Sequence, residues 1–191
     1  MITGETESGY LTGQLLIAMP SMPDPRFERT VIYMCAHSAE GAMGLVVNRL
    51  FDELTFTDLL DQVGVDAEEC SHEVPVHSGG PVEAGRGFVL HSAEFTQEGT
   101  MAIDERFSLT ASIDILRSIS HGEGPKDSLL ALGYSGWGPG QLESEIQANG
   151  WLTAPADGAI VFKSDLGEKW AKSIEKIGVD FSMLSGDAGR A

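Results

Sequence analysis

Residues whose types and spacing suit chemistry are concentrated in a glycine-rich segment, residues 128–155, which holds two of the three tryptophans. Within it, Gly133-Tyr134-Ser135-Gly136-Trp137 places a serine among glycines, in the manner of a hydrolase nucleophile at a strand-to-helix turn. That turn needs glycine two residues on either side of the serine, and bulky Trp137 occupies the later position. Four histidines are candidate bases, and spacing selects none of them: His37, His77, His91 and His121. We therefore expect Ser135 to be a small polar residue in a tight turn, and we assign no catalytic residue.

The same glycines allow a phosphate-binding interpretation, because backbone N–H groups and a helix N-terminus attract anions. The stretch Gly-Trp-Gly-Pro-Gly nevertheless matches neither the Walker loop, since no Lys-Ser/Thr follows, nor the dinucleotide fingerprint. Glu143 and Glu145 also place carboxylates near the start of the next helix, where they would repel phosphate. We expect Glu143 to satisfy the helix N–H groups itself. This segment supplies four candidate ligand- or partner-binding residues: Gly136, Trp137, Gln141 and Glu143.

A metal site is a third interpretation. We expect Cys35 and His37 on the same side of one strand, since side chains along a strand repeat every two residues. His77 and His91 lie on predicted strands that could neighbour it. No His-x-x-x-His or Cys-x-x-Cys spacing supports ligation. We therefore expect satisfied core histidines and a buried thiol, and we assign neither a metal nor a cofactor.

Cations near the glycine-containing turns form the second group of candidates. Arg86 follows the Gly79-Gly80-Pro81 turn, and Arg49 directly follows Asn48. A guanidinium can hold a carboxylate or phosphate through two parallel hydrogen bonds, so these positions are candidate contacts for an anionic ligand or a partner's carboxylate. The alternative is internal pairing with some of the 29 acidic residues. The candidates from these turns are Asn48, Arg49, Gly79, Gly80 and Arg86.

The elements that must position these residues follow from short apolar runs and their punctuation. Predicted strands cover residues 14–19, 30–37, 42–48, 74–77, 87–91, 107–110, 128–134 and 159–162, with one more after Asn149-Gly150. We expect Gly136, Gly138 and Gly140 to break the strand at 128–134 and to bend the chain into a helix.

Helices are predicted over residues 56–63, 112–121, about 139–148 and 165–177. Their predicted caps are Thr55, Ser112 and Asp165 with Glu168, and Asn149-Gly150 ends the third helix. Predicted inward residues of the second helix are Ile113, Leu116 and Ile119. Strands and helices alternate without a strict βαβ rhythm. We therefore predict a single compact α/β domain, residues 13–184, with a mixed central β-sheet and flanking helices, between flexible ends 1–12 and 185–191.

Composition limits the partners. Lys plus Arg number 12 against 29 Asp plus Glu, a formal charge of −17 that opposes direct nucleic-acid binding and anionic lipid. Two cysteines do not make a disulfide framework, and the N-terminus has no signal-peptide pattern. Apolar runs such as residues 15–19 are too short to cross a bilayer. We expect a cytoplasmic protein that binds neither nucleic acid nor membrane.

The sequence contains four long segments in order: GQLLIAMPSMPDPRFERTVIYMCAHSAEGAMGLVVNR, SGGPVEAGRGFVLHS, LTASIDILRSI and GEGPKDSLLALGYSGWGPGQLESEIQANGWL. Together they resemble the YqgE/AlgH family of bacterial proteins over residues 13–162, and more weakly over 177–191. The resemblance implies a compact mixed α/β fold and no established reaction. Members are often labelled transcriptional regulators, although no helix-turn-helix pattern occurs here. Ser135 stands where alanine is common in the family, which further weakens the nucleophile interpretation.

These observations favour a non-enzymatic regulatory or binding role, with an unknown protein or small molecule as partner. The glycine-containing turns around Gly79 and Gly136 are the expected recognition surface. The alternative is an enzyme that acts on a small anionic or nucleotide-like substrate at those turns. A structural interaction protein with an exposed apolar patch is a third possibility.

Overall fold

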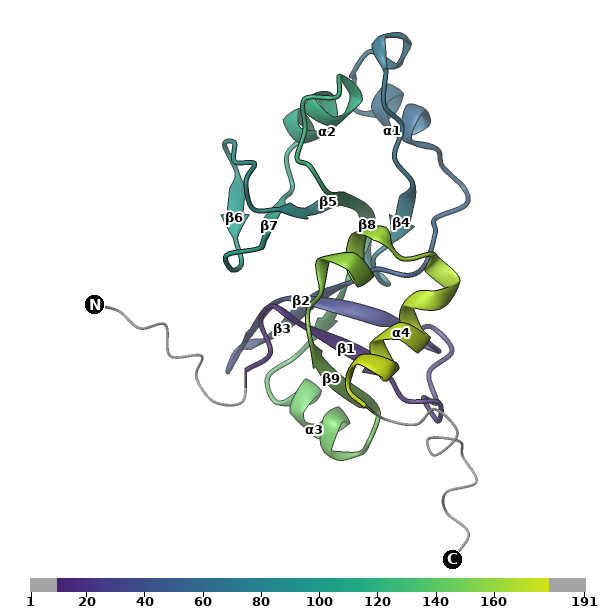
Figure 1. Cartoon of the computed structure of the whole chain (residues 1–191), viewed down its shortest axis with the longest axis vertical. Coiled ribbons are helices and arrows are strands. Elements are labelled where there is room, and N and C mark those ends of the chain that lie inside the picture. The colour runs from purple at the N-terminus through teal and green to yellow at the C-terminus, as the bar shows by residue number, and fades with distance from the viewer. Residues whose placement is uncertain (1–9, 179–191) are drawn as a thin grey trace, which may run out of the picture.

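The computed structural model describes residues 10–178, so the predicted tail 185–191 and residues 1–9 of the predicted N-terminal tail lie outside the described residues. Within 10–178 the chain forms one nine-stranded sheet with a few short helices (Figure 1). The strands are β1 (Gln14–Ala18), β2 (Val31–Ser38), β3 (Gly41–Val46), β4 (Val76–Ser78), β5 (Val82–Ser92), β6 (Thr100–Ala102), β7 (Phe107–Thr110), β8 (Ser128–Trp137) and β9 (Trp151–Pro155). The α-helices are α1 (Phe56–Gln62), α2 (Ile113–Ser120), α3 (Gln141–Gln147) and α4 (Lys169–Lys176). None of these helices is both long and apolar enough to cross a bilayer.

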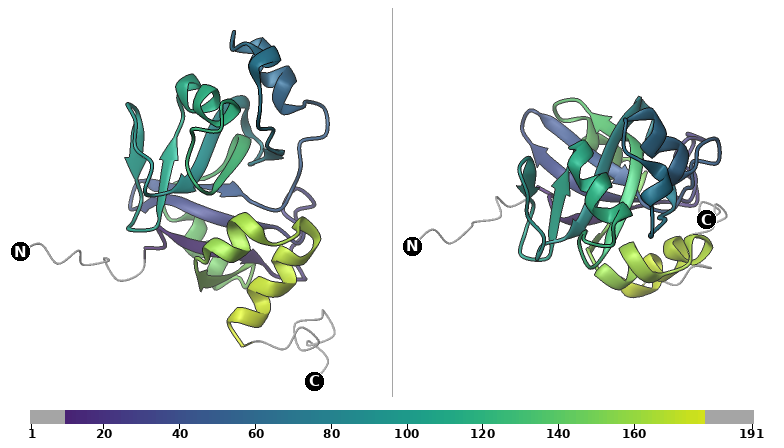
Figure 2. Two further views of the ribbon diagram at one scale, coloured as in Figure 1. Left: turned by 45° about the horizontal axis from the view of Figure 1, so that its top comes forward. Right: turned by 90° about the horizontal axis from the view of Figure 1, so that it is seen from above.

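The sheet is mostly antiparallel. Its strands follow the order β6-β7-β5-β8-β3-β2-β1-β9, and β4 pairs with β8 outside this path as the parallel pair. The single compact domain predicted from the sequence is correct, but the α/β description with flanking helices gave the helices too much weight. The molecule is a curled sheet to which short helices are added (Figure 2). Hairpins such as β2–β3 explain the difference, because antiparallel neighbours need no helical crossover.

Helices α1 and α2 cover one end of the sheet, at the top of Figure 1. The predicted cap of α1 is confirmed: Thr55 Oγ1 accepts the Asp58 N–H at 3.2 Å, and the Asp58 carboxylate accepts the Thr55 N–H at 3.0 Å. In α2 the predicted inward position Ile113 is wrong, since that side chain is 48% exposed. Ile115 is buried in its place, because the inward stripe of this short helix runs through Ile115, Leu116 and Ile119.

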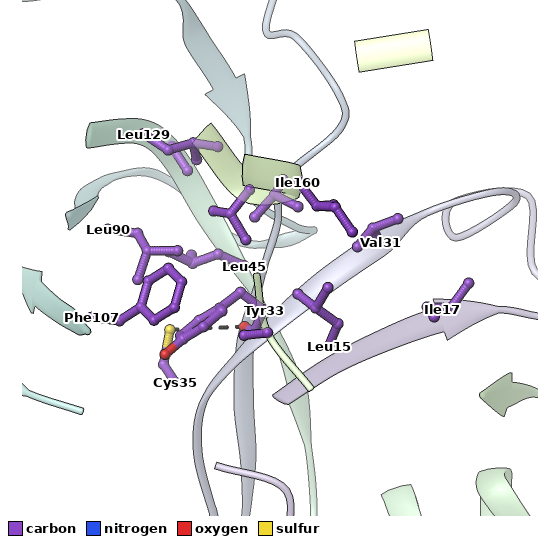
Figure 3. Packing of buried hydrophobic residues seen from close by; sticks show 14 of the residues in the cluster. Leu15, Ile17, Val31, Tyr33, Cys35, Leu45, Leu90, Phe107, Leu129 and Ile160 are labelled. Carbon is purple, nitrogen blue, oxygen red and sulfur yellow. Dashed lines mark hydrogen bonds between the residues drawn. The ribbon is translucent and has the colours of Figure 1, made fainter. Parts of the chain in front are cut away.

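Opposite faces of β1 and β2 carry separate cores, as strand alternation requires. Leu16 and Met34 face α3 and its buried Leu142. On the other face, Leu15 and Tyr33 belong to the largest cluster, which α4 closes with Trp170 and Ile174. Figure 3 shows this cluster, in which the Tyr33 and Phe107 rings lie 4.7 Å apart. Leu142 lies on the buried face of α3, and Trp170 and Ile174 lie on that of α4.

Two predictions near the C-terminus are wrong. The apolar run 159–162 forms a π-helical turn, Ala159–Lys163, and not a strand. Asp157 Oδ1 accepts the Ala159 N–H at 2.9 Å and starts this turn, while Ile160 and Val161 are buried. A short apolar run does not by itself distinguish a buried helical turn from a strand. Asp165 likewise makes no side-chain cap, and α4 begins only at Lys169.

Candidate functional site

Strand β8 is the point at which the sheet curls. Its first part pairs with β5, where Leu130 lies opposite Val89, and its last three residues pair with β3. The predicted strand break at Gly136 is wrong: Gly136 lies opposite Met43, and the strand continues to Trp137. The chain turns only afterwards, at Gly140, whose φ of +72° precedes α3. The register of β5 shifts between Val82 and Gly87, and this irregularity lies beside the curl.

The curl leaves a groove of about 760 Å³, to which β2, β3, β5, β7 and β8 all contribute. Its apolar and aromatic lining includes Met43, Phe88, Leu109, Tyr134 and Trp137. Its charged residues, among the described residues, are Glu40 and Arg86. Chemically, the groove offers an apolar surface with one cation and one anion.

Two candidate residues, Gly136 and Trp137, form a wall that the groove shares with a second hollow of about 440 Å³. Gly136 is exposed, and a Cβ there would lie 3.3 Å from the Tyr134 ring. Its backbone φ is outside the left-handed region, so the glycine is not needed for the local conformation. Its effect is to leave space over the strand.

Trp137 is held by a carboxylate. Glu145 Oε1 accepts the indole N–H of Trp137 at 3.3 Å and that of Trp151 at 3.1 Å. Gln141 donates its side-chain amide to Glu145 Oε2 at 3.1 Å and accepts the Gly138 N–H at 3.0 Å. The candidate Gln141 therefore helps to orient Trp137, and it also lines the second hollow. Glu145, the residue that joins these groups, was not among the predicted site residues.

Glu143 has a structural role, because its carboxylate binds His37. The Glu143 carboxylate lies 2.6 Å from His37 Nε2. His37 Nδ1 accepts the Leu11 N–H at 3.0 Å, so Nε2 carries the proton and donates it to Glu143. The pKa of Glu143 is lowered from its ordinary value, first by the carboxyl's bond from its own backbone N–H and then by the bond from His37. Glu143 thus ties α3 to β2.

Arg86 lies on the groove wall, in the irregular part of β5. Its guanidinium carbon is 5.1 Å from the centre of the Phe88 ring, two residues along the strand. Its carboxylate contact, Glu83, is distant at 3.5 Å, and both side chains are more than half exposed. A pair of this kind contributes little, so the Arg86 charge remains available to a ligand.

Asn48 and Arg49 support the loop before β2. The Asn48 side chain accepts the Val31 N–H at 2.9 Å and donates to the Arg29 carbonyl at 2.8 Å. The Arg49 guanidinium donates to the carbonyls of Arg26 and Glu28. Arg49 also lines a small hollow of about 220 Å³. Its expected internal pairing is therefore with backbone carbonyls, and not with acidic side chains.

Gly79 and Gly80 allow β4 to approach β8 closely. A Cβ on Gly79 would lie 2.4 Å from the Gly133 carbonyl oxygen, and one on Gly80 would lie 2.2 Å from the Tyr134 carbonyl carbon. The Gly79 N–H donates to the Leu132 carbonyl at 2.8 Å, and its own carbonyl accepts the Val46 N–H at 2.9 Å. Gly79 is thus buried and packed against β8, whereas Gly80 lines the same small hollow as Arg49.

Ser135 is not at a turn. It lies inside β8, is fully buried, and donates to the Gly79 carbonyl at 3.2 Å. Two of the histidines proposed as bases are bound elsewhere: His77 contacts the Leu130 carbonyl, and His91 contacts the Thr110 hydroxyl. Ser135 is therefore a structural hydroxyl, and the expectation of a tight turn is corrected to a strand.

Cys35 and His37 point to opposite faces of the sheet, contrary to the expectation from strand alternation. A bulge between Met34 and Ala36 inserts a residue and shifts the alternation. Cys35 belongs to the largest core cluster, and burial raises the pKa of its thiol to about 12. Within residues 10–178, no group of three or more His, Cys, Asp or Glu side chains is arranged to hold a metal ion.

The structure divides the predicted residues among three neighbouring depressions. Arg86, Gly136 and Trp137 meet at the groove, and Gln141 joins the last two at the second hollow. Arg49 and Gly80 meet at the small hollow. Sequence reasoning missed Phe88 and Tyr134 on the groove wall, and Arg26 and Ser78 in the small hollow. The spacing of Arg86 and Phe88 could have identified Phe88, since alternate residues of a strand share a face.

Comparison with known proteins identifies the relatives of the chain. The AlgH-like family model matches residues 15–182. A UPF0301 protein of Rhodospirillum rubrum is 49% identical over 187 residues, covering 98% of this chain and 97% of the relative. Another, from Bradyrhizobium diazoefficiens, is 52% identical over 194 residues, covering 97% and 91%. None of these names states a reaction or a ligand.

Two solved structures share the fold. The solution structure of the AlgH protein from Pseudomonas aeruginosa has a TM-score of 0.79 and 40% identity, with 98% of this chain and 99% of that one covered. The crystal structure of protein DIP2367 from Corynebacterium diphtheriae has a TM-score of 0.70 at 19% identity, covering 91% and 90%, and is similar in fold alone. By its match to the family model and its identity to these relatives, the chain belongs to the AlgH-like family.

Proposed function

We propose that this protein is a non-enzymatic, cytoplasmic regulator that binds a small amphipathic carboxylate in the groove beside β8. The observation that carries the proposal is the groove itself. Its volume of about 760 Å³ is within the usual range for small-molecule sites, and its mixture of apolar walls with a few polar groups is typical of them.

The charge at the groove favours an anion. Arg86 is the cation among the described residues that line it, and its contact with Glu83 is long and exposed. A guanidinium stacked on Phe88 is well placed to receive a carboxylate while the ligand's apolar part covers Met43 and Tyr134. Glu40, also in the lining, disfavours ligands with several negative charges.

Binding is favoured over catalysis because, among the described residues, no hydroxyl in the groove lining is hydrogen-bonded to a histidine or a carboxylate; the Ser38 hydroxyl there accepts the Glu40 backbone N–H at 3.1 Å. Ser135 is buried and its hydroxyl donates to the Gly79 carbonyl, and none of the described histidines lines the groove. The alternative, an enzyme acting on a small anionic or nucleotide-like substrate, requires chemistry from groups not gathered there. The formal charge of −17 also favours regulation through a small-molecule or protein partner over direct contact with nucleic acid.

Removal of the Arg86 charge tests this proposal. The probes are phenylacetate and the neutral phenylacetamide, which have the same ring and differ in charge. Wild-type protein should bind phenylacetate more tightly, with amide NMR shifts at Gly136 and Trp137. In Arg86→Gln the preference for the carboxylate should fall about tenfold, because a charged hydrogen bond is lost.

Arg117→Gln is the matched control, since Arg117 is an exposed arginine on α2 that pairs with Asp114 at 3.0 Å. It removes the same charge away from the groove and should keep the preference. Equal binding of the two probes by wild-type protein, or equal effects of the two substitutions, would contradict the proposal. Turnover of either probe would favour the enzymatic alternative.

A further inference from the structure

A second site, with its own cations, is indicated by two arginines that meet in a very acidic chain. The small hollow of about 220 Å³ is lined by Arg26, Val46, Arg49, Ser78, Gly80 and Pro81. It lies between the loop that precedes β2 and the turn that joins β4 to β5. Arg86 is not part of its lining, and neither Arg26 nor Arg49 lines the groove.

Arg49 has donors to spare. Its hydrogen bonds to residues 10–178 go to the backbone carbonyls of Pro25, Arg26 and Glu28 and use only the two terminal nitrogens. A guanidinium has five N–H donors, so some remain for a ligand. Within the described residues Arg49 has no carboxylate at ion-pair distance. Its positive charge is therefore held in place by the loop, with Asp24 near enough to interact with it beyond ion-pair distance.

Arg26 adds a second guanidinium. It pairs with Asp24 at 2.7 Å. The hydrogen bond from Arg26 lowers the pKa of Asp24 from its ordinary value, so this carboxyl stays ionised near neutral pH. Two guanidiniums against one carboxylate leave the hollow with a net positive charge. Arg26 is exposed, and Asp24 holds it through both Nε and a terminal nitrogen, so a ligand oxyanion has to compete with Asp24 for these donors.

Neutral donors complete the site. The Ser78 hydroxyl and the Gly80 backbone N–H make no hydrogen bond to any residue between 10 and 178. A hydroxyl, a backbone N–H and two guanidiniums around one small hollow are the donors by which proteins bind tetrahedral oxyanions.

The neighbouring hollow of about 440 Å³ can hold the organic part of a ligand whose anionic group binds in the small hollow. It shares Arg26 and Pro81 with the small hollow, and Met22, Phe27 and Trp137 supply its apolar surface. A molecule with a compact anionic head and a planar or apolar body fits the two together. We propose that Arg26, Arg49, Ser78 and Gly80 bind the phosphate of a phosphate monoester, with its organic part in the adjoining hollow.

The test is a calorimetric titration of the full chain with inorganic phosphate and with phenyl phosphate. Phenyl phosphate should bind more tightly than inorganic phosphate, because only the ester places a ring against Phe27 and Trp137. Arg26→Gln should weaken binding of both probes about tenfold, since a charged hydrogen bond is lost. Arg117→Gln removes the same charge from another arginine–aspartate pair and should leave binding unchanged.

Asp24→Asn provides a change in the opposite direction. It releases the Arg26 guanidinium from its ion pair. Asn keeps a side-chain oxygen that can accept the Arg26 backbone N–H, as Asp24 does at 3.0 Å. Binding of phosphate should become tighter, a result that a damaged fold would not give. Equal affinities in Arg26→Gln and Arg117→Gln, or no gain in Asp24→Asn, would overturn the site. Equal affinity for the two probes would overturn the assignment of a phosphate monoester and leave free phosphate as the ligand.

Discussion

Lys169 is a buried cation that is balanced by carbonyl groups. Its side chain is 3% exposed, and its ammonium donates to the Val47 carbonyl at 2.8 Å and the Val161 carbonyl at 2.6 Å. Within the described residues it has no carboxylate at ion-pair distance. Burial lowers the pKa of Lys169 to about 8. The lysine thus fastens α4 and the π-helical turn to the end of β3 at an electrostatic cost.

This cost predicts that stability increases with pH. The folded-state pKa of about 8 lies below the reference value of 10.5, so between these values the unfolded chain binds more protons and the free energy of unfolding rises. The rise from this group is roughly 3 kcal/mol at most. A neutral amine retains two N–H groups, so both carbonyl bonds can persist. Urea denaturation at pH 7 to 10.5 measures the effect.

Lys169→Met should lose this pH-dependent rise. The control is Lys172→Met on the same helix, where the lysine is 46% exposed and pairs with Glu168 at 3.0 Å. That variant should follow the wild-type curve. An identical pH slope in wild type and Lys169→Met would show that Lys169 does not pay a burial cost in the folded state.

At the scale of elements, the crossing of the β4–β5 turn over β8 depends on missing side chains. Gly79→Ala would place its Cβ 2.4 Å from the Gly133 carbonyl oxygen. Because the carbonyl belongs to the backbone and a Cβ is fixed by the backbone of its own residue, the overlap is relieved only by moving strands, at a cost of about 1–3 kcal/mol. Gly85→Ala, where no atom lies within 4 Å of the added Cβ, should cost far less. Denaturant titration measures the stability of both variants, and equal unfolding midpoints would contradict this account of the crossing.

Local sequence patterns predicted the elements that depend on local forces. Strands β2 and β3, the Thr55 cap and the Asn149-Gly150 end of α3 follow from apolar runs and capping chemistry. The strand at β8 was predicted to end too early, because its last residues are held by β3, about ninety positions away in the sequence. The bulge at Cys35 was equally invisible, since it depends on register with a partner strand.

The candidate site was less predictable than the fold. Arg86, Gly136 and Trp137 were named from the sequence, but that they share one groove depends on the curl of the sheet. Arg49 and Glu143 were named for a ligand, but in the structure Arg49 donates to the Glu28 carbonyl and Glu143 accepts from His37. Arg26 was missed because its neighbour in the hollow, Gly80, lies far along the sequence.

At the scale of the whole molecule, the depressions lie close together although the chain carries a charge of −17. The groove shares Val82, Gly136 and Trp137 with the second hollow, which in turn shares Arg26 and Pro81 with the small one. Arg86, Arg26 and Arg49 thus place local positive charge on a negative molecule. Such local charge selects small anions, while the overall charge opposes large polyanions.

The most direct test of the groove is to fill it without disturbing the backbone. Gly136→Leu adds a side chain to an exposed strand position with ordinary φ, and Gly167→Leu adds the same side chain where no atom lies within 4 Å. Both variants should fold, as judged by thermal unfolding. Titration with phenylacetate should then show binding in wild type and Gly167→Leu, and a loss of about tenfold or more in Gly136→Leu. Unchanged affinity in a folded Gly136→Leu protein would contradict the assignment of the groove as the recognition site.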